Sequence, residues 1–168
     1  MPMLSTSADA HIDAPASLVL EILRDFDGHH RRILPDAFSD FEVVHGGHGA
    51  GTKTRFKFRL GGRTTETRTV ATEPEPGLIR EQVLDRDMVT LFRVQDEGEG
   101  SHLTISTEWT PAGGLSGRLE RRFAPGMLHK VYVEELGLIA DYAGTLARSS
   151  APLIVTSAPE AEAVTSAA

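Results

Sequence analysis

One carboxylate occupies an unusual place in the segment LHKVYVEELGLIADYAGTL, which covers residues 128 to 146. At about 100° per residue, the apolar side chains of this segment fall on one broad stripe of a helix. The stripe comprises Leu128, Val131, Tyr132, Leu138, Ile139, Tyr142 and Leu146. Glu135 falls near the middle of this stripe, whereas its neighbour Glu134 lies off to the side. Because charged side chains are rarely buried without a partner, Glu135 requires an explanation.

Two interpretations of Glu135 stay open. If the stripe faces a cavity, Glu135 is a polar group in an apolar pocket, where it can orient a ligand. Loss of hydration would then raise its pKa, so that it could act as a general acid or base. Alternatively, Glu135 is structural: it pairs with an arginine of a strand, such as Arg68, or reaches solvent at the pocket mouth.

Aromatic side chains are the other candidates for a binding site. The hydroxyl of Tyr132 or Tyr142 could hydrogen-bond a ligand carbonyl, or it could lie at the edge of a packed face. Trp109, the only tryptophan, lies on the apolar side of its strand, as cavity wall or as core. The same choice applies to three phenylalanines: Phe56, Phe58 and Phe92.

The sequence favours neither a metal nor a cofactor. The chain has seven histidines but no H-x-x-x-H or H-E-x-x-H spacing, and it has no cysteine. The glycine-rich segment GGHGAG lacks the G-K-[ST] ending of a phosphate-binding loop. We therefore predict no bound metal and no cofactor. His30 is a candidate for ligand contact at a pocket mouth, with a surface role as the favoured alternative.

Composition narrows the class of partner and the cellular location. The formal net charge of −7 argues against a nucleic-acid partner, since phosphate binding needs an excess of lysine and arginine. No apolar run approaches the roughly 18 residues that span a bilayer, and the first residues do not resemble a secretory signal. We expect a soluble, cytoplasmic protein without integral membrane association. The oligomeric state stays open, with a homodimer as one option.

Hydrophobic periodicity predicts an α+β domain with one antiparallel sheet and helices segregated from it. In the strand at 52–60, for example, Phe56 and Phe58 face one side and the intervening basic residues face the other. The orientation of the return strand at 63–72 stays open. The expected strands are 8–12, 41–45, 52–60, 63–72, 78–83, 88–94 and 102–110; the expected helices are 15–25, 29–34 and 115–148, the last broken near 124–126. We place a flexible N-terminus at 1–6, one domain at 7–148, and a disordered Ala/Ser/Pro-rich tail at 149–168.

Several short motifs in this order resemble those of the SRPBCC superfamily (START-like, helix-grip proteins), particularly its polyketide cyclase/dehydrase branch. The motifs are HIDAPASLVLEILRD at the start, ILP at 33–35, G-x-G-T at 49–52, TEPEPGLI at 72–79, and GGLSGRLERRFAP before the last helix. The resemblance covers about residues 7 to 147. It implies a seven-stranded curved antiparallel sheet wrapped around the C-terminal helix, with two short helices near the N-terminus.

The resemblance also implies a deep, mostly apolar cavity between the sheet and the long helix. Members of the superfamily bind lipids, quinones, polyketides or hormones, and some catalyse cyclisation or dehydration. Our leading hypothesis is therefore a module that binds a small hydrophobic molecule. The alternative is a cyclase/dehydrase-type enzyme that uses Glu135 as acid or base together with a cavity tyrosine. The predicted ligand-binding residues are Phe56, Phe58, Phe92, Trp109, Leu128, Val131, Tyr132, Glu135, Ile139 and Tyr142.

Overall fold

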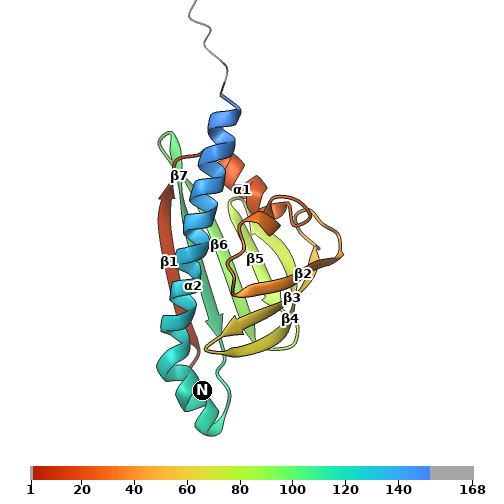
Figure 1. Ribbon diagram of the computed structural model, residues 1–168, viewed down its shortest axis with the longest axis vertical. Helices are drawn as coiled ribbons and strands as arrows, with labels where there is room; N and C mark the ends of the chain where they lie inside the picture. Colours follow the sequence, from red (N-terminus) through yellow and green to blue (C-terminus); the bar gives the residue numbers. More distant parts are fainter. Residues whose placement is uncertain (1, 152–168) are drawn as a thin grey trace, which may run out of the picture.

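The computed structural model describes residues 2–151, which form one sheet, one long helix and two short helical segments (Figure 1). The strands are β1 (Leu4–Ile12), β2 (Phe38–His45), β3 (Lys53–Leu60), β4 (Arg63–Glu75), β5 (Leu78–Val83), β6 (Met88–Glu97) and β7 (Gly100–Trp109). The helices are α1 (Ala16–Arg24), the single-turn 3-10 helix η1 (His30–Arg32) and α2 (Gly114–Ser149). From residue 152 onward, the predicted tail lies outside the described residues.

The seven strands form one antiparallel sheet in the order β1-β7-β6-β5-β4-β3-β2. The first strand therefore pairs with the last, and the other strands follow as consecutive hairpins. α2 crosses one face of the curved sheet and packs mainly along β1 (Figure 1). This arrangement confirms the predicted helix-grip fold. It leaves the part of the concave face formed by β3 to β6 farther from α2 than the part formed by β1 (Figure 1).

Exposed and buried side chains alternate along the strands, so one face of the sheet is exposed to solvent and the other is packed. In β3, Lys53, Arg55 and Lys57 are exposed, whereas Phe56 is only 8% exposed. The turn from β3 to β4 is made by Gly61 and Gly62, whose φ angles are 58° and 78°. Positive φ at both positions is typical of the tight hairpin turn that matches the twist of paired strands, and glycine adopts it without a steric penalty.

The orientation of β4, which the sequence left open, is settled by burial. Thr69 and Ala71 are buried and Thr67 is half-buried, so these side chains point toward α2. Arg68 points outward and forms an ion pair with Asp85 at 2.7 Å. Threonines, and not the charged residues between them, therefore line the inner face of this strand.

The core lies where α1, the β1–β7 edge of the sheet and α2 meet. α1 begins after Pro15 and turns Val19, Ile22 and Leu23 inward, as the helical spacing predicted. These side chains pack with Ile12, Leu103, Ile105, Leu136 and Ile139, all buried. The dry core thus occupies one end of the space under α2, near its C-terminal half (Figure 1).

The structure corrects the sequence-based prediction at the start of the sheet and within the long helix. β1 begins at Leu4, which pairs with Trp109, so residues 4–6 belong to the sheet and not to a loose N-terminus. α2 also continues through Pro125 without the predicted break. Thr6 donates a hydrogen bond from its hydroxyl to the carbonyl of Pro125 at 3.1 Å, and Ala124 is buried beside it. The contact of α2 with β1 at Pro125 therefore outweighs the local cost of proline in a helix.

Among residues 2–151, no helix has both the length and the apolar character needed to cross a membrane.

Candidate functional site

A cavity of about 730 Å³ lies between the concave face of the sheet and α2. Its lining comes from η1, from β2 to β7 and from the first half of α2. The apolar side chains that line it include Leu34, Phe38, Phe41, Phe56, Phe58, Phe92, Trp109, Met127 and Leu128. This volume is within the range of about 300 to 1,000 Å³ that is typical of small-molecule sites.

Most of the predicted ligand-binding residues lie on this cavity. Seven of them line it: Phe56, Phe58, Phe92, Trp109, Leu128, Tyr132 and Glu135. Three others do not belong to the lining. Ile139 is fully buried in the core, Val131 is half-buried against the same core, and the hydroxyl of Tyr142 contacts Nδ1 of His29 at 2.7 Å. The stripe on α2 therefore faces the cavity in its first half and the dry core in its second half.

A band of polar side chains crosses the inner face of the sheet. Glu81 of β5 is paired in register with Thr90 of β6, which is paired with Thr107 of β7. The hydroxyls of Thr90 and Thr107 hydrogen-bond at 2.8 Å, and the Thr107 hydroxyl also hydrogen-bonds the hydroxyl of Tyr132 on α2. We call Glu81, Thr90, Thr107 and Tyr132 the polar band. It gives an otherwise apolar cavity a defined polar wall.

Glu135 lies in this cavity with its side chain almost fully buried. It is 2% exposed, so it does not reach solvent at the pocket mouth. Arg68, the partner that the alternative interpretation suggested, is engaged with Asp85 on the outer face of the sheet. Burial, and secondarily the charge of Glu81, raises the pKa of Glu135 to about 8. Glu135 is therefore a cavity carboxyl that is largely protonated near neutral pH.

Sequence analysis did not single out Glu81, the second carboxyl of the cavity. Burial raises its pKa from 4.5 to about 7, and Oε1 has no hydrogen-bond partner among the described residues. A signal was present, because period two places Glu81 on the same face of β5 as Ile79 and Val83. Both of these neighbours are buried. An apolar-acid-apolar alternation in a short strand thus indicates an acid that points inward.

The tyrosine of the cavity is Tyr132. Burial raises the pKa of its hydroxyl above the ordinary value, and the negative charges of Glu135 and Glu81 raise it further. Hydrogen bonds with Thr107 and Thr90 oppose this effect only partly. Tyr132 is therefore a neutral hydroxyl at physiological pH, fixed in orientation by the polar band.

His30 lines the cavity from η1 and is buried, which corrects the surface role that the sequence favoured. Its ring stacks on Phe26 with centroids 4.6 Å apart, and Nδ1 lies 2.9 Å from the carbonyl oxygen of Leu23. Burial lowers the pKa of His30 to about 4, so the imidazole is neutral. The backbone contact assigns the proton to Nδ1, because a carbonyl oxygen can only accept.

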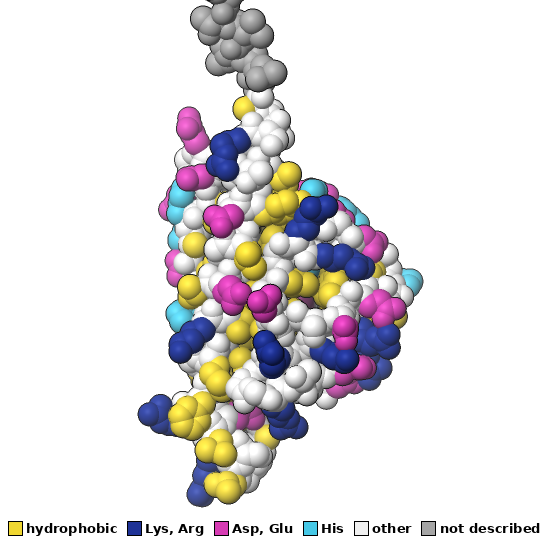
Figure 2. Space-filling view, in the orientation of Figure 1, with side chains coloured by type: hydrophobic (Ala, Val, Ile, Leu, Met, Phe, Trp, Pro, Cys, Tyr) yellow, Lys and Arg dark blue, Asp and Glu magenta, His cyan; other side chains and the backbone are white. Residues whose placement is uncertain are grey.

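The mouth of the cavity is bordered by the N-terminal part of α2, which extends past the end of the sheet (Figures 1 and 2). Figure 2 shows hydrophobic side chains gathered there with basic ones among them. Leu119 and Phe123, which are 57% and 52% exposed, line this mouth. Glu120 anchors the segment: its carboxylate accepts hydrogen bonds from the indole of Trp109 at 2.9 Å and the amide of Ala112 at 2.9 Å.

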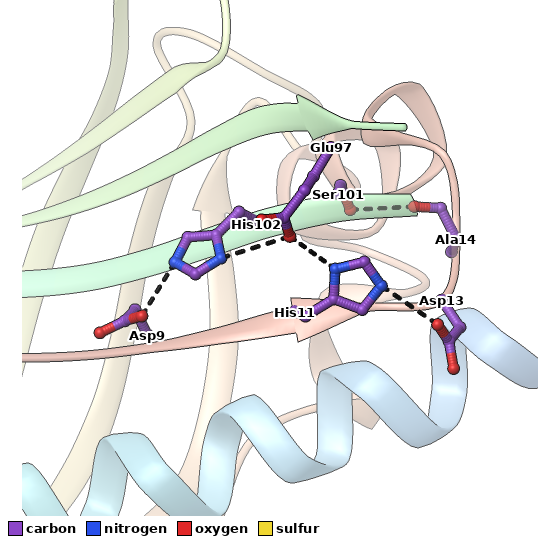
Figure 3. Close-up of polar contacts among 7 residues, drawn as sticks. All are labelled: Asp9, His11, Asp13, Ala14, Glu97, Ser101 and His102. Atoms are coloured by element: carbon purple, nitrogen blue, oxygen red, sulfur yellow. Dashed lines mark hydrogen bonds and ion pairs between the residues drawn. The ribbon is translucent and has the colours of Figure 1, made fainter. Parts of the chain in front are cut away.

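A separate group of titratable side chains lies on β1, β6 and β7 and on the turn after β1 (Figure 3). Nδ1 of His11 lies 2.6 Å from the carboxylate of Glu97, and Nε2 of His102 lies 2.8 Å from that of Asp9. The hydrogen bond to Glu97 raises the pKa of His11 and lowers that of Glu97. The group lies outside the cavity lining. Within residues 2–151, no set of three or more histidine or carboxylate side chains has the arrangement of a metal site.

Comparison with solved structures gives several likenesses. The chain resembles the NMR solution structure of a protein named KanY, with a TM-score of 0.76 and 27% identity over 85% of this chain and 99% of that one. It also resembles the Zhui aromatase/cyclase from a Streptomyces species, with a TM-score of 0.69 and 17% identity over 84% of this chain and 94% of that one. A third likeness is to major latex-like protein 151 from Panax ginseng, with a TM-score of 0.66 and 11% identity over 84% and 97% of the two chains.

A comparison with curated proteins by sequence found no match. By contrast, a family model described as "Polyketide cyclase / dehydrase and lipid transport" matches residues 3–144, which is nearly all of the folded chain. The fold that carries this match is one used for hydrophobic ligands or for polyketide cyclisation. The chain belongs to the polyketide cyclase/dehydrase and lipid transport family.

Proposed function

We propose that this protein encloses a small hydrophobic molecule, such as a lipid, quinone or polyketide-like compound, in the cavity between the sheet and α2. The cavity of about 730 Å³ with its apolar lining is the observation that carries the proposal. Apolar burial supplies the affinity, at roughly 25 cal/mol per Å² of ligand surface removed from water. The two carboxyls and Tyr132 supply orientation, since a few placed polar groups fix how a ligand lies in an apolar site.

Fluorescence of the neutral apolar dye N-phenyl-1-naphthylamine tests the proposal, because the dye becomes bright on leaving water. We expect saturable binding by the intact protein and loss of most of it in Thr67→Phe, which places a ring into the cavity from β4. Thr67 lines the cavity, whereas Thr64 on the same strand is exposed and does not. Thr64→Phe is therefore the matched control. Absence of saturable binding, or equal binding by the two variants, would contradict the proposal.

A second candidate function is a cyclase/dehydrase-type enzyme. It is favoured by one observation: burial raises the pKa values of Glu81 and Glu135 to about 7 and about 8, close to physiological pH. Groups with such values exchange protons efficiently in either direction near neutral pH. In a dehydration, the protonated Glu135 would give its proton to the departing hydroxyl while the ionised Glu81 takes a proton from the adjacent carbon. The C–O bond breaks as the C=C bond forms, and water leaves.

Glu135→Gln separates this enzyme from a binding protein. A glutamine keeps the shape of the side chain but cannot transfer a proton. A molecule retained through gentle purification and identified by native mass spectrometry would serve as the substrate. Turnover of that molecule that disappears in Glu135→Gln while binding persists would support the enzyme. Binding without conversion, in both proteins, would leave the binding function alone.

A further inference from the structure

The polar wall of the cavity has an unmet hydrogen-bonding capacity at Glu81. Oε1 of this residue is buried and has no partner among the described residues. A buried polar atom without a partner is costly, and native proteins seldom retain one without a reason. Glu81 also lines the cavity and is half-buried as a residue, so its side chain borders the space that a ligand would occupy.

No cation of the described chain balances the two cavity carboxyls. No ion pair of Glu81 or Glu135 occurs within residues 2–151. The basic groups of the lining are Arg63, Arg86 and His30. Arg63 is exposed beside the hairpin turn, and Arg86 pairs with Glu120 at 3.1 Å. Burial keeps His30 neutral by lowering its pKa to about 4.

The remaining charged groups beside the cavity are acidic, and they are exposed or already paired. Glu66 is exposed, and Asp85 is held by Arg68 on the outer face. Tyr132 is neutral, because its pKa is raised. The inner part of the cavity therefore combines apolar walls with two acids and no compensating positive charge.

We propose that the cavity binds an apolar molecule whose inner end carries a hydrogen-bond donor, and that it holds a protonated amine more tightly than a hydroxyl. This inference rests on the proposed binding function and names the chemistry of its ligand. The donor would bind the carboxyl of Glu81 from the cavity side. A charged donor to a carboxylate makes a stronger bond than a neutral one, particularly away from water. An anionic group would be repelled by the ionised form of Glu81.

Four probes that share a decyl chain test this order: decylamine, decanol, decyl methyl ether and decanoate. Each displaces N-phenyl-1-naphthylamine from the protein at concentrations below its micelle threshold. We expect decylamine to bind about tenfold or more tightly than decyl methyl ether, with decanol between them and decanoate weakest. Raising the pH from about 6 to about 8 should strengthen the binding of decylamine only, since the carboxyls ionise over this interval.

Two variants assign the preference to Glu81. Glu81→Leu should bind decylamine no better than decyl methyl ether, each compared by displacement after the variant's own affinity for the dye has been measured. Glu66→Gln removes an exposed acid and should keep the full preference. Equal affinity of the intact protein for decylamine and decyl methyl ether, or a preference that survives in Glu81→Leu, would overturn the inference. Failure to bind the dye at all would instead contradict the proposed function.

Discussion

Replacing Glu135 with glutamine should prevent much of the loss of stability that the protein undergoes as the pH rises. Burial raises the pKa of Glu135 from 4.5 to about 8. The folded state therefore holds this proton more tightly than the unfolded chain does. The resulting stabilisation is fully present below pH 4.5 and is lost as the pH rises through about 8.

The size of this loss follows from the interval between the two pKa values. Each pH unit between them costs about 1.4 kcal/mol, so the full loss is up to about 5 kcal/mol. This is a large share of the roughly 5 to 15 kcal/mol that stabilises a typical domain. Glutamine cannot ionise. The free energy of unfolding of Glu135→Gln should therefore equal that of the native protein near pH 5 and exceed it by several kcal/mol near pH 9. Glu81 still titrates in the variant, so some pH dependence remains.

Urea unfolding at intervals from about pH 5 to about pH 9, followed by the fluorescence of Trp109, measures this difference. Glu134→Gln is the matched control, because Glu134 is the exposed neighbour of Glu135 on α2. The control should retain the slope of the native protein. If the free energies of unfolding of the native protein and of Glu135→Gln run parallel across this interval, Glu135 ionises freely in the folded state and our account of the cavity is wrong.

Three further outcomes are expected. His30→Phe should resist acid better than the native protein. Because the pKa of His30 is lowered, its contribution to stability is present above pH 6.5 and is lost, by up to about 3 kcal/mol, as the pH falls toward about 4. Urea unfolding across that interval tests this expectation. Gly117→Ala should lower the midpoint of thermal unfolding, since its Cβ would collide with the carbonyl oxygen of Ala112, whereas Gly137→Ala in open space should raise stability by about 1 kcal/mol. Tyr132→Phe should cost about 1 kcal/mol in urea unfolding by removing one hydrogen bond of the polar band; no loss would show that the bond contributes nothing.

The order of helices and strands was predictable because the apolar residues of each segment recur with the spacing of a helix or of a strand. The alternation of Phe56 with Lys53 and Arg55 in β3 and the apolar spacing in α1 both agree with the observed burial. Glu135 was identified for the same reason, since an acid at the centre of an apolar stripe contradicts the pattern around it. Local sequence sufficed wherever a side chain's environment is set by its own element.

The parts that were missed depend on contacts between distant segments. Pro125 carries a strong local signal to end a helix, and only its packing against β1, with the hydrogen bond from Thr6, shows why the helix continues. Ile139 and Tyr142 share a helix face with Glu135, yet α1 and His29 fill the space beside them, so this part of the face meets core and not cavity. The periodicity of apolar residues shows which face of a helix is buried, but not at which turns of the helix other elements pack against that face.

The anchoring of the N-terminal part of α2 has a kinetic consequence. One carboxylate, that of Glu120, joins this segment to Trp109, Ala112 and Arg86. The same segment supplies the side chains that border the opening of the cavity. Loosening this segment changes the rates of ligand entry and exit far more than the affinity for the ligand, because the inner cavity walls stay in place. Glu120→Gln should therefore speed both uptake and release of the dye in stopped-flow measurements while leaving its equilibrium affinity nearly constant; unchanged rates would show that ligands pass elsewhere.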